Sequence, residues 1–264
     1  MKGLLEVNED ITLIKLLKAM IDNGVDLVSV MQNNKSLGIV SFENILLYML
    51  ESGERLNDIL NRHARDFTTP PRYILNHEVD HDELRRVILS MESYEPLFVV
   101  ENDHLVAVIT LGDMLSSLSF VKPLLCEAVT RSRKLGTLVA PNTTIKGCVK
   151  RMIRDNSKQA VVHRKGRVLG LINQFDIMNC LISSNTLDHI RLGIDDYFFH
   201  ATCSTIMRRN FEYLLAGNYE RAYQMLLNKE HLVVLDSHSS KRLVKFISVN
   251  SAFILLKEAL KRHF

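Results

Sequence analysis

Pairs of polar residues three positions apart recur along the chain, each directly after a short apolar run. The pairs are Ser41 and Asn44, Thr110 and Asp113, Asn173 and Asp176, and Ser248 and Ser251. A hydroxyl or amide at a helix start can cap the helix, and the group three positions on can face a polar ligand. A helix N-terminus also offers free N–H groups and a positive dipole end to phosphate. The pattern therefore predicts either plain helix caps or a binding site built on them.

Other motifs that carry chemistry are weak in this sequence. A structural zinc needs four spaced ligands, which the segment from His200 to Cys203 does not supply. The sequence has no P-loop, no G-x-G-x-x-G and no H-E-x-x-H. No acid, base and nucleophile form a set in any part of it. We expect a protein that is not an enzyme and that needs no metal or resident cofactor.

The composition is that of a soluble intracellular protein. The chain has 264 residues, of which 47% are hydrophobic, an ordinary value for globular domains. No apolar run approaches the roughly 18 residues of a membrane span, and Met1 is soon followed by acidic residues, unlike a secretory signal. The four cysteines are widely separated, so we expect no disulfide framework. A cytoplasmic protein without membrane contact is the expectation.

The charge is unevenly distributed. Residues 1–119 hold 10 Lys+Arg against 19 Asp+Glu, a net charge of −9, whereas residues 120–264 hold 23 against 11, a net charge of +12. Basic runs such as Arg131–Lys134 and Met207–Arg209 could line a nucleotide cleft or bind nucleic acid. Without Trp and with only 7% aromatic residues, a base-stacking platform has little support.

One unit of strand, helix, strand, strand and helix repeats four times. In the first copy Leu13, Leu16, Leu17, Met20 and Ile21 form the apolar stripe of a helix, and residues 27–31 and 37–40 form a hairpin around a polar turn. The later hairpins are expected at 97–100 with 105–109, 160–162 with 168–172, and 232–235 with 243–247. The sequence therefore predicts an α+β (α/β) fold.

The repeats are too short to bury their own helices and sheets well. The residues that follow the four hairpins, Ser41, Thr110, Asn173 and Ser248, are 69, 63 and 75 residues apart. We expect neighbouring copies to pair, giving one module over residues 1–119 (copies at about 1–53 and 54–119) and another over 120–264 (copies at about 120–187 and 188–264). Lys122-Pro123 is interpreted as part of the linker between them.

The unit resembles the cystathionine beta-synthase (CBS) domain. The most specific feature is the pattern apolar-Gly-apolar-apolar-Ser/Thr-x-x-Asp/Asn-apolar, which Leu37 to Ile45 matches closely. The second copy has Ala107 for the Gly, the third has Asn173 for the hydroxyl residue, and the fourth has lost both the Gly and the Asp. Four copies resemble the gamma subunit of AMP-activated protein kinase and archaeal four-CBS proteins, which implies two CBS pairs (Bateman modules) in a disk-like assembly.

The resemblance implies a regulatory protein that binds AMP, ADP or ATP, with S-adenosylmethionine as a further option, in clefts between paired repeats. It implies that the pairs Ser41/Asn44, Thr110/Asp113 and Asn173/Asp176 contact ribose, whereas Ser248/Ser251 is a degenerate site. It also implies phosphate contacts from Lys158 and His231, just ahead of a hairpin. The first two copies have Leu27 and Pro96 at the equivalent places. Anionic ligands are therefore expected mainly in the second module.

Several alternatives stay open from the sequence. The chain could be a nucleotide-independent scaffold whose basic C-terminal half binds nucleic acid or an acidic protein. The segment 188–210 is interpreted as a partly helical excursion with its aromatic residues packed inward, or as a surface for a protein partner. The identity of that partner and the association of two chains into a homodimer are also left open.

Overall fold

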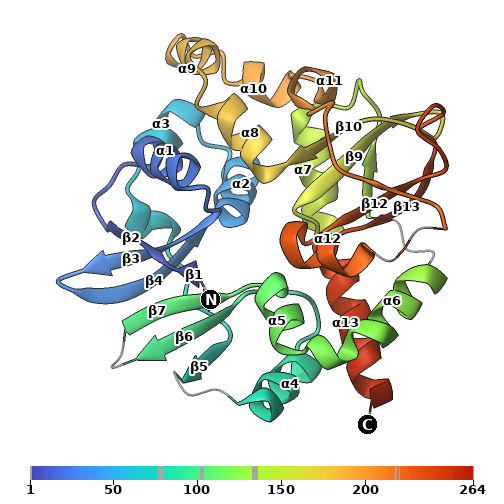
Figure 1. Cartoon of the computed structure of the whole chain (residues 1–264). Helices are drawn as coiled ribbons and strands as arrows, with labels where there is room; N and C mark the ends of the chain where they lie inside the picture. The colour runs from blue at the N-terminus through green and yellow to red at the C-terminus, as the bar shows by residue number, and fades with distance from the viewer. Residues whose placement is uncertain are drawn as a thin grey trace.

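The structure is a computed structural model that describes residues 2–76, 80–101, 104–132, 136–217, 219 and 221–263. Four α/β repeats lie around a common centre, each with one small sheet and helices packed against it (Figure 1). The predicted hairpins are confirmed to within one or two residues. The fourth hairpin begins and ends as the sequence predicts, at Leu232–Leu235 and Leu243–Ile247.

The first repeat consists of β1 (Lys2–Gly3), β2 (Leu5–Asn8), α1 (Leu13–Asn23), β3 (Leu27–Gln32), β4 (Lys35–Ser41) and α2 (Phe42–Glu51). The connection to the second repeat carries α3 (Leu56–Asn61) and a 3-10 turn (Ala64–Phe67). The second repeat consists of β5 (Ile74–Asn76), α4 (His81–Ser90), β6 (Leu97–Glu101), β7 (His104–Ile109) and α5 (Leu111–Ser117).

The chain continues through a 3-10 turn (Ser119–Val121) and α6 (Lys122–Arg131). The third repeat consists of β8 (Thr137–Val139), α7 (Ile145–Arg154), β9 (Gln159–Arg164), β10 (Arg167–Asn173) and α8 (Gln174–Leu181). A helical excursion follows, with α9 (Ser184–Arg191), α10 (Asp196–His200) and α11 (Cys203–Ile206). The fourth repeat consists of β11 (Leu214–Leu215), α12 (Ala222–Lys229), β12 (Leu232–Leu235), β13 (Leu243–Ile247) and α13 (Val249–His263).

Each repeat lends a stretch of backbone to the sheet edge of its neighbour. The segment that leads into the second repeat pairs through Thr69 with Ile39 of β4, and β1 pairs in return with β7. The second half repeats this exchange, because Arg208 pairs with Leu171 of β10 and the Gly136 N–H donates to the Phe246 carbonyl of β13. Repeats 1 and 2 are therefore interlocked, and so are repeats 3 and 4.

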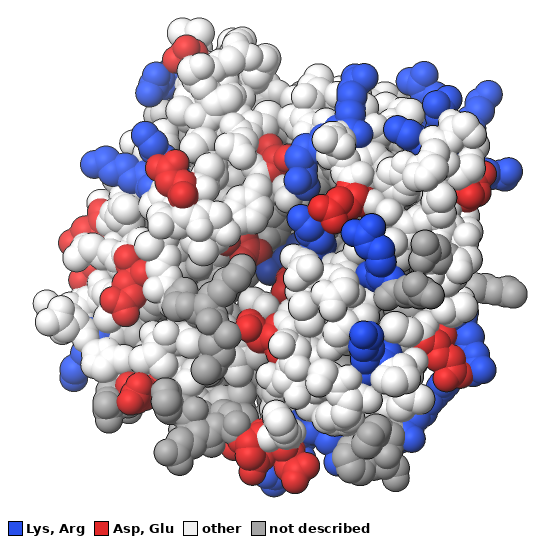
Figure 2. All heavy atoms as spheres, in the orientation of Figure 1, with Lys and Arg blue, Asp and Glu red and all other residues white. Residues whose placement is uncertain are grey.

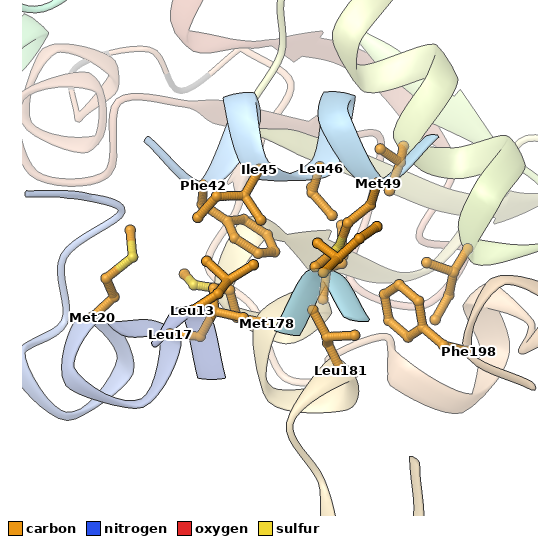
Figure 3. Packing of buried hydrophobic residues seen from close by; sticks show 14 of the residues in the cluster. Leu13, Leu17, Met20, Phe42, Ile45, Leu46, Met49, Met178, Leu181 and Phe198 are labelled. Carbon is orange, nitrogen blue, oxygen red and sulfur yellow. The ribbon is translucent and has the colours of Figure 1, made fainter. Parts of the chain in front are cut away.

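Helices close the ring in the other direction. One buried core joins α1 and α2 of the first repeat to α7 and α8 of the third (Figure 3), and a second core joins α4 and α5 to α12 and α13. Leu13, Leu17 and Met178 in the first of these cores have no exposed surface. Two smaller apolar clusters lie between the sheets of repeats 1 and 2 and between those of repeats 3 and 4. Every repeat thus packs on two others.

The segment expected to be a linker is helical. Lys122 begins α6, and Pro123 stands in its first turn, where a missing N–H costs nothing and the fixed φ suits a helix. Leu125 and Val129 are buried against α13. The segment thus connects the second and third repeats as a packed helix, because Pro is tolerated in the first turn of a helix although it disrupts a helix interior.

The excursion after the third repeat is helical, as expected. Phe198 and Phe199 pack into the core shared by repeats 1 and 3. Tyr197 instead lies at the surface, stacked on His189 with ring centroids 3.8 Å apart. Among the residues that the structure describes, no helix is long and apolar enough to cross a membrane.

Candidate functional site

A cavity of about 910 Å³ lies where the first two repeats meet the third. Its walls come from the junction of β4 and α2, from the connector Thr68–Pro70, from the segment Ser93–Pro96 before β6, and from Lys158 before β9. Its size is at the upper end of the range for small-molecule sites. Of the predicted site residues, Ser41, Asn44 and Lys158 line this cavity.

The fold holds Ser41 and Asn44 in place through backbone geometry. The Ser41 hydroxyl caps α2 by accepting from the Asn44 N–H at 3.2 Å, and the Asn44 side-chain amide donates to the Thr69 hydroxyl at 3.2 Å. Thr69 can lie this close because Gly38 has no side chain: a Cβ there would be 2.6 Å from the Thr69 carbonyl oxygen. Gly38, the glycine of the repeat pattern, thus lets the segment Thr68–Pro70 pass close to β4 and form one wall of the cavity.

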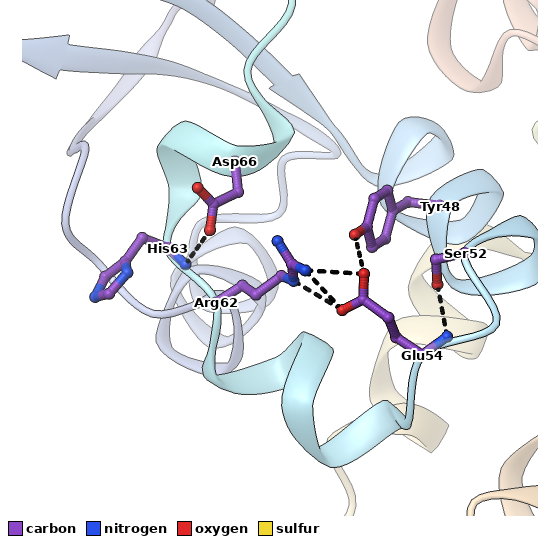
Figure 4. Close-up of polar contacts among 6 residues, drawn as sticks. All are labelled: Tyr48, Ser52, Glu54, Arg62, His63 and Asp66. Atoms are coloured by element: carbon purple, nitrogen blue, oxygen red, sulfur yellow. Dashed lines mark hydrogen bonds and ion pairs between the residues drawn. The ribbon is translucent and has the colours of Figure 1, made fainter.

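Hydrogen bonds and an ion pair also fix the chain segment between α2 and Thr68. The Arg62 guanidinium donates to both oxygens of Glu54, at 2.9 and 2.8 Å, and the Tyr48 hydroxyl donates to the same carboxylate (Figure 4). Tyr48 and Asp66 belong to the cavity wall. Asp66 accepts from the His63 N–H at the start of the 3-10 turn that leads to Thr68. The wall is therefore anchored before any ligand arrives.

Lys158 reaches the cavity from the third repeat and forms an ion pair across the repeats. Its Nζ lies 2.6 Å from Oδ2 of Asp26, and both side chains are about one quarter exposed (27% each). Burial by itself lowers the pKa of Lys158, but the Asp26 carboxylate beside it raises the pKa above its usual value. Lys158 therefore remains a cation and is already paired.

Strand register identifies the counterparts of Lys158 in the other repeats. Gln159 pairs with Asn173, and the matching pair of the first repeat is Leu27 with Ser41. In the second and fourth repeats the pairs one step further along the hairpin are Leu97 with Ile109 and Leu232 with Ile247. The residues equivalent to Lys158 are therefore Asp26, Glu95 and Glu230. The sequence analysis expected Leu27, Pro96 and His231 to be the counterparts of Lys158, and each of these lies one residue too far along the chain. Three of the four central positions are acidic.

Negative charge is in excess around the cavity. Its lining includes five carboxyl side chains (Asp26, Glu43, Glu51, Asp66 and Glu95) and two cations (Arg72 and Lys158). Arg72 is paired with Glu95 at 2.9 Å, just as Lys158 is with Asp26. Glu43 has no ion-pair partner among the described residues, and burial raises the pKa of its carboxyl. The cavity is thus less attractive to polyanions than the sequence suggested.

Tyr94 connects the cavity wall to the second, third and fourth repeats. It is 4% exposed, and the Lys158 ammonium lies 6.0 Å from its ring centroid. Its hydroxyl accepts from the Leu111 N–H at 3.2 Å, and its own N–H donates to Asn250 at 3.0 Å. Sequence analysis missed Tyr94, Asp26 and Glu43. The signal for Asp26 was its place directly before a hairpin, whereas nothing local distinguishes Tyr94.

The comparisons with known proteins match this architecture. The family model described as CBS domain matches residues 1–51 and 137–183. These two segments are the first and the third of the four repeats. Protein MJ1225 of Methanocaldococcus jannaschii is 24% identical over 225 residues, which are 79% of each chain.

Solved structures extend the likeness to the whole chain. The crystal structure of MJ1225, described as a proposed archaeal homologue of g-AMPK, superimposes with a TM-score of 0.78 at 20% identity, over 100% of this chain and 97% of that one. An uncharacterized conserved protein from Pyrococcus horikoshii gives 0.52 at 16% identity, over 98% and 97%. At these identities the likeness establishes the fold alone, an arrangement of four α/β repeats.

In the second and third repeats the predicted pairs form reciprocal caps. Asp113 accepts from the Thr110 N–H at 3.0 Å, and Asp176 accepts from the Asn173 N–H at 2.8 Å. Asp176 is also bound by Arg208 Nε at 3.0 Å. None of these four residues lines the cavity.

In the fourth repeat a lysine side chain takes the place of the repeat glycine. Lys245 stands where the first repeat has Gly38, and it is 6% exposed. Its ammonium donates to the carbonyls of Val129 and Thr130, in the last turn of α6. Ser248 is buried and its hydroxyl bonds with Ser251, while His231 Nδ1 lies 2.7 Å from the Lys229 carbonyl and burial lowers the pKa of its ring. These residues also lie outside the cavity.

The four cysteines are free thiols. Within the described residues no group of three or more His, Cys, Asp or Glu side chains converges as a metal site. Arg133 and Lys134, part of a predicted basic run, lie outside the described residues.

Proposed function

We propose that this chain is a non-enzymatic regulatory protein that binds an adenosine nucleotide in the central cavity. The observation that carries the proposal is the meeting of Ser41, Asn44 and Lys158 in one cavity of nucleotide size. Asn44 would present its carbonyl oxygen to the ribose hydroxyls. Ile39, Pro70 and Phe98 supply apolar surface for the adenine.

The charges favour a ligand with one phosphate over a ligand with three. A phosphate must compete with Asp26 for Lys158, and each further phosphate adds negative charge next to Glu43 and Glu95. AMP is therefore the expected ligand, and affinity should fall from AMP to ADP to ATP. This differs from the expectation that anions bind mainly in the second module, which rested on Lys158 and His231 and on the positive net charge of that module.

Binding would be transmitted through Lys158 and Tyr94. A phosphate that draws Lys158 from Asp26 loosens the link between repeats 1 and 3, and Tyr94 carries hydrogen bonds to repeats 2 and 4. A ligand that favours one arrangement by about 1 to 3 kcal/mol is enough for a useful response. A protein partner that senses the arrangement completes the proposed regulatory role.

The test is calorimetric titration of the full chain with adenosine, AMP, ADP, ATP and S-adenosylmethionine. We expect saturable binding of AMP, and a loss of about tenfold in Asn44→Ala for every adenosine ligand. Lys158→Met should remove the advantage of AMP over adenosine. Ser251→Ala, the equivalent position in the fourth repeat, is the matched control and should change neither.

Two outcomes would count against the proposal. Absence of binding by all five ligands at millimolar concentration would exclude an adenosine sensor. Binding of S-adenosylmethionine in preference to AMP would keep the adenosine site and exclude the monophosphate as its ligand.

A further inference from the structure

The turns of the third and fourth hairpins lie against each other at the edge of the second module. Arg167 forms an isolated antiparallel bridge with Arg242. The Val168 N–H donates to the Lys241 carbonyl at 2.9 Å, and the Leu243 N–H donates to the Gly166 carbonyl at 2.8 Å. Main-chain bonds thus hold residues 164–167 and 236–242 together as one surface, here named the paired turns.

The paired turns carry several cationic side chains that form no ion pairs with the described residues. Five cationic side chains belong to them: Arg164, Lys165, Arg167, Lys241 and Arg242. None has an ion-pair partner among the described residues, although arginines such as Arg62, Arg154 and Arg191 do. Asp236 is the acid within the turn, and its carboxylate accepts from the backbone N–H groups of Ser237 and Arg242.

The fold does not require this concentration of charge. The equivalent turn of the first repeat is Gln32-Asn33-Asn34-Lys35, with one cation, and the turn of the second is flanked by Glu101 and His104. Figure 2 shows blue side chains gathered over the upper right of the molecule, where Figure 1 places β9, β10, β12 and β13. Unpaired like charges held side by side repel one another, and a polyanion would relieve that repulsion.

A row of aromatic side chains adjoins the paired turns. His238 stands in the turn between β12 and β13, and its Nδ1 lies 2.7 Å from the Tyr213 hydroxyl. The Tyr213 ring centroid is 5.6 Å from that of His238 and 5.9 Å from that of Phe211. His238 is exposed, and Tyr213 and Phe211 are partly exposed. Flat side chains beside cations offer stacking surface for bases next to contacts for phosphates.

We propose that the paired turns and this aromatic row bind single-stranded nucleic acid. The five cations contact successive phosphates, and the aromatic rings stack with bases. An acidic protein would use the cations alone, so the aromatic row favours the nucleic acid. The surface is distinct from the adenosine cavity, whose lining includes none of these residues.

The test is fluorescence anisotropy of the full chain with a labelled uridine RNA of about 20 nucleotides, over a series of salt concentrations. We expect binding that weakens with salt. The triple variant Arg164→Gln, Arg167→Gln, Arg242→Gln should reduce the slope of log K against log[salt] by about 2, three phosphate contacts at about 0.7 each. The matched control removes the same charge from the first module, through Lys15→Gln, Lys18→Gln and Lys35→Gln, and should leave the slope unchanged.

The aromatic row is tested separately by His238→Ala and Tyr213→Leu, which should weaken binding several-fold at constant slope. Equal binding of duplex RNA, or of polyglutamate, would overturn the assignment to single strands. So would absence of binding at low salt, or an equal loss in the control variant. An excess of AMP should not displace the RNA, so failure of the adenosine site and failure of this surface are distinguishable.

Discussion

At the scale of single residues, the charged side chains around the central cavity determine which ligands it can bind. The four equivalent positions before the hairpins carry three carboxylates and one ammonium, and Glu43 adds a partly buried carboxyl without an ion-pair partner among the described residues. The five carboxyl side chains that line the cavity all belong to residues 1–119, whose net charge is −9, so the cavity is locally acidic although Lys158 comes from the basic half. The local arrangement, and not the net charge of +12, sets which ligands fit.

Glu43 makes stability depend on pH in a defined direction. Burial raises the pKa of Glu43 in the folded chain, so the ionised form is disfavoured there relative to the unfolded chain. The resulting loss of stability is present above the folded pKa and absent below the unfolded pKa of about 4.3. Glu43→Gln should therefore raise the free energy of unfolding at pH 7, and the gain should vanish near pH 4.

Urea unfolding at a series of pH values measures this effect. Glu6→Gln, on the exposed side of β2, is the control and should show little change at any pH. A gain in Glu43→Gln that stays constant from pH 7 to pH 4 would contradict the raised pKa of the Glu43 carboxyl as its cause.

Sequence reasoning at this scale reached Ser41, Asn44 and Lys158 and missed their partners. Asp26 and Tyr94 meet Lys158 only because repeats 1, 2 and 3 converge, and no local pattern encodes that meeting. The sequence also predicted ribose-contacting pairs in the first three repeats and a degenerate site in the fourth. The structure shows Lys245 bound to α6 in the fourth and Arg208 on Asp176 in the third.

At the scale of elements, glycines decide where segments can cross. Gly38 has φ of +142° and faces the Thr69 carbonyl, and Gly170 similarly faces the Arg208 carbonyl with a would-be Cβ contact of 2.6 Å. The repeat pattern marked both positions, although it did not show what approaches them. The hairpins were predictable because apolar runs around polar turns are a local signal. Helix α6 was not predictable in this way, because it belongs to no repeat.

Gly38→Ala should lower the free energy of unfolding by about 3 kcal/mol, from the unfavourable φ and from the clash with backbone. Urea unfolding measures the loss, and AMP binding should weaken with it because Thr69 forms part of the cavity wall. Gly53→Ala is the matched control. Gly53 has φ of +71° with nothing within 4 Å, so it should cost only about 1 kcal/mol. Equal losses would exclude the close approach as the cause.

At the scale of the whole molecule, the two modules share their cores. The division into residues 1–119 and 120–264 remains a prediction about modules, but it does not describe independent folding units. α1 packs on α8, and α13 packs on α4 and α5, so each half without the other exposes its apolar helix faces. The sequence could predict the pairing of repeats, whereas closure of the ring depends on helix faces from distant segments.

The full chain should therefore unfold in one calorimetric transition. Met178→Ala, in the core between repeats 1 and 3, should destabilise by about 2 to 5 kcal/mol and shift that transition without splitting it. A fragment of residues 120–264 should self-associate on size exclusion or bind a hydrophobic dye. A monomeric fragment with its own sharp transition would contradict the shared cores.

The exchange of edge strands also sets an order of events during synthesis. Gly3 of β1 pairs with Ala107 of β7, 104 residues later in the chain. At roughly 5 to 20 residues per second, the first strand emerges from the ribosome about 5 to 20 seconds before its partner exists. Throughout that interval β1 is an unpaired edge segment on a half-made protein. Nascent chains are then open to the wrong partner, and a chaperone that shields β1 should raise the yield of folded protein.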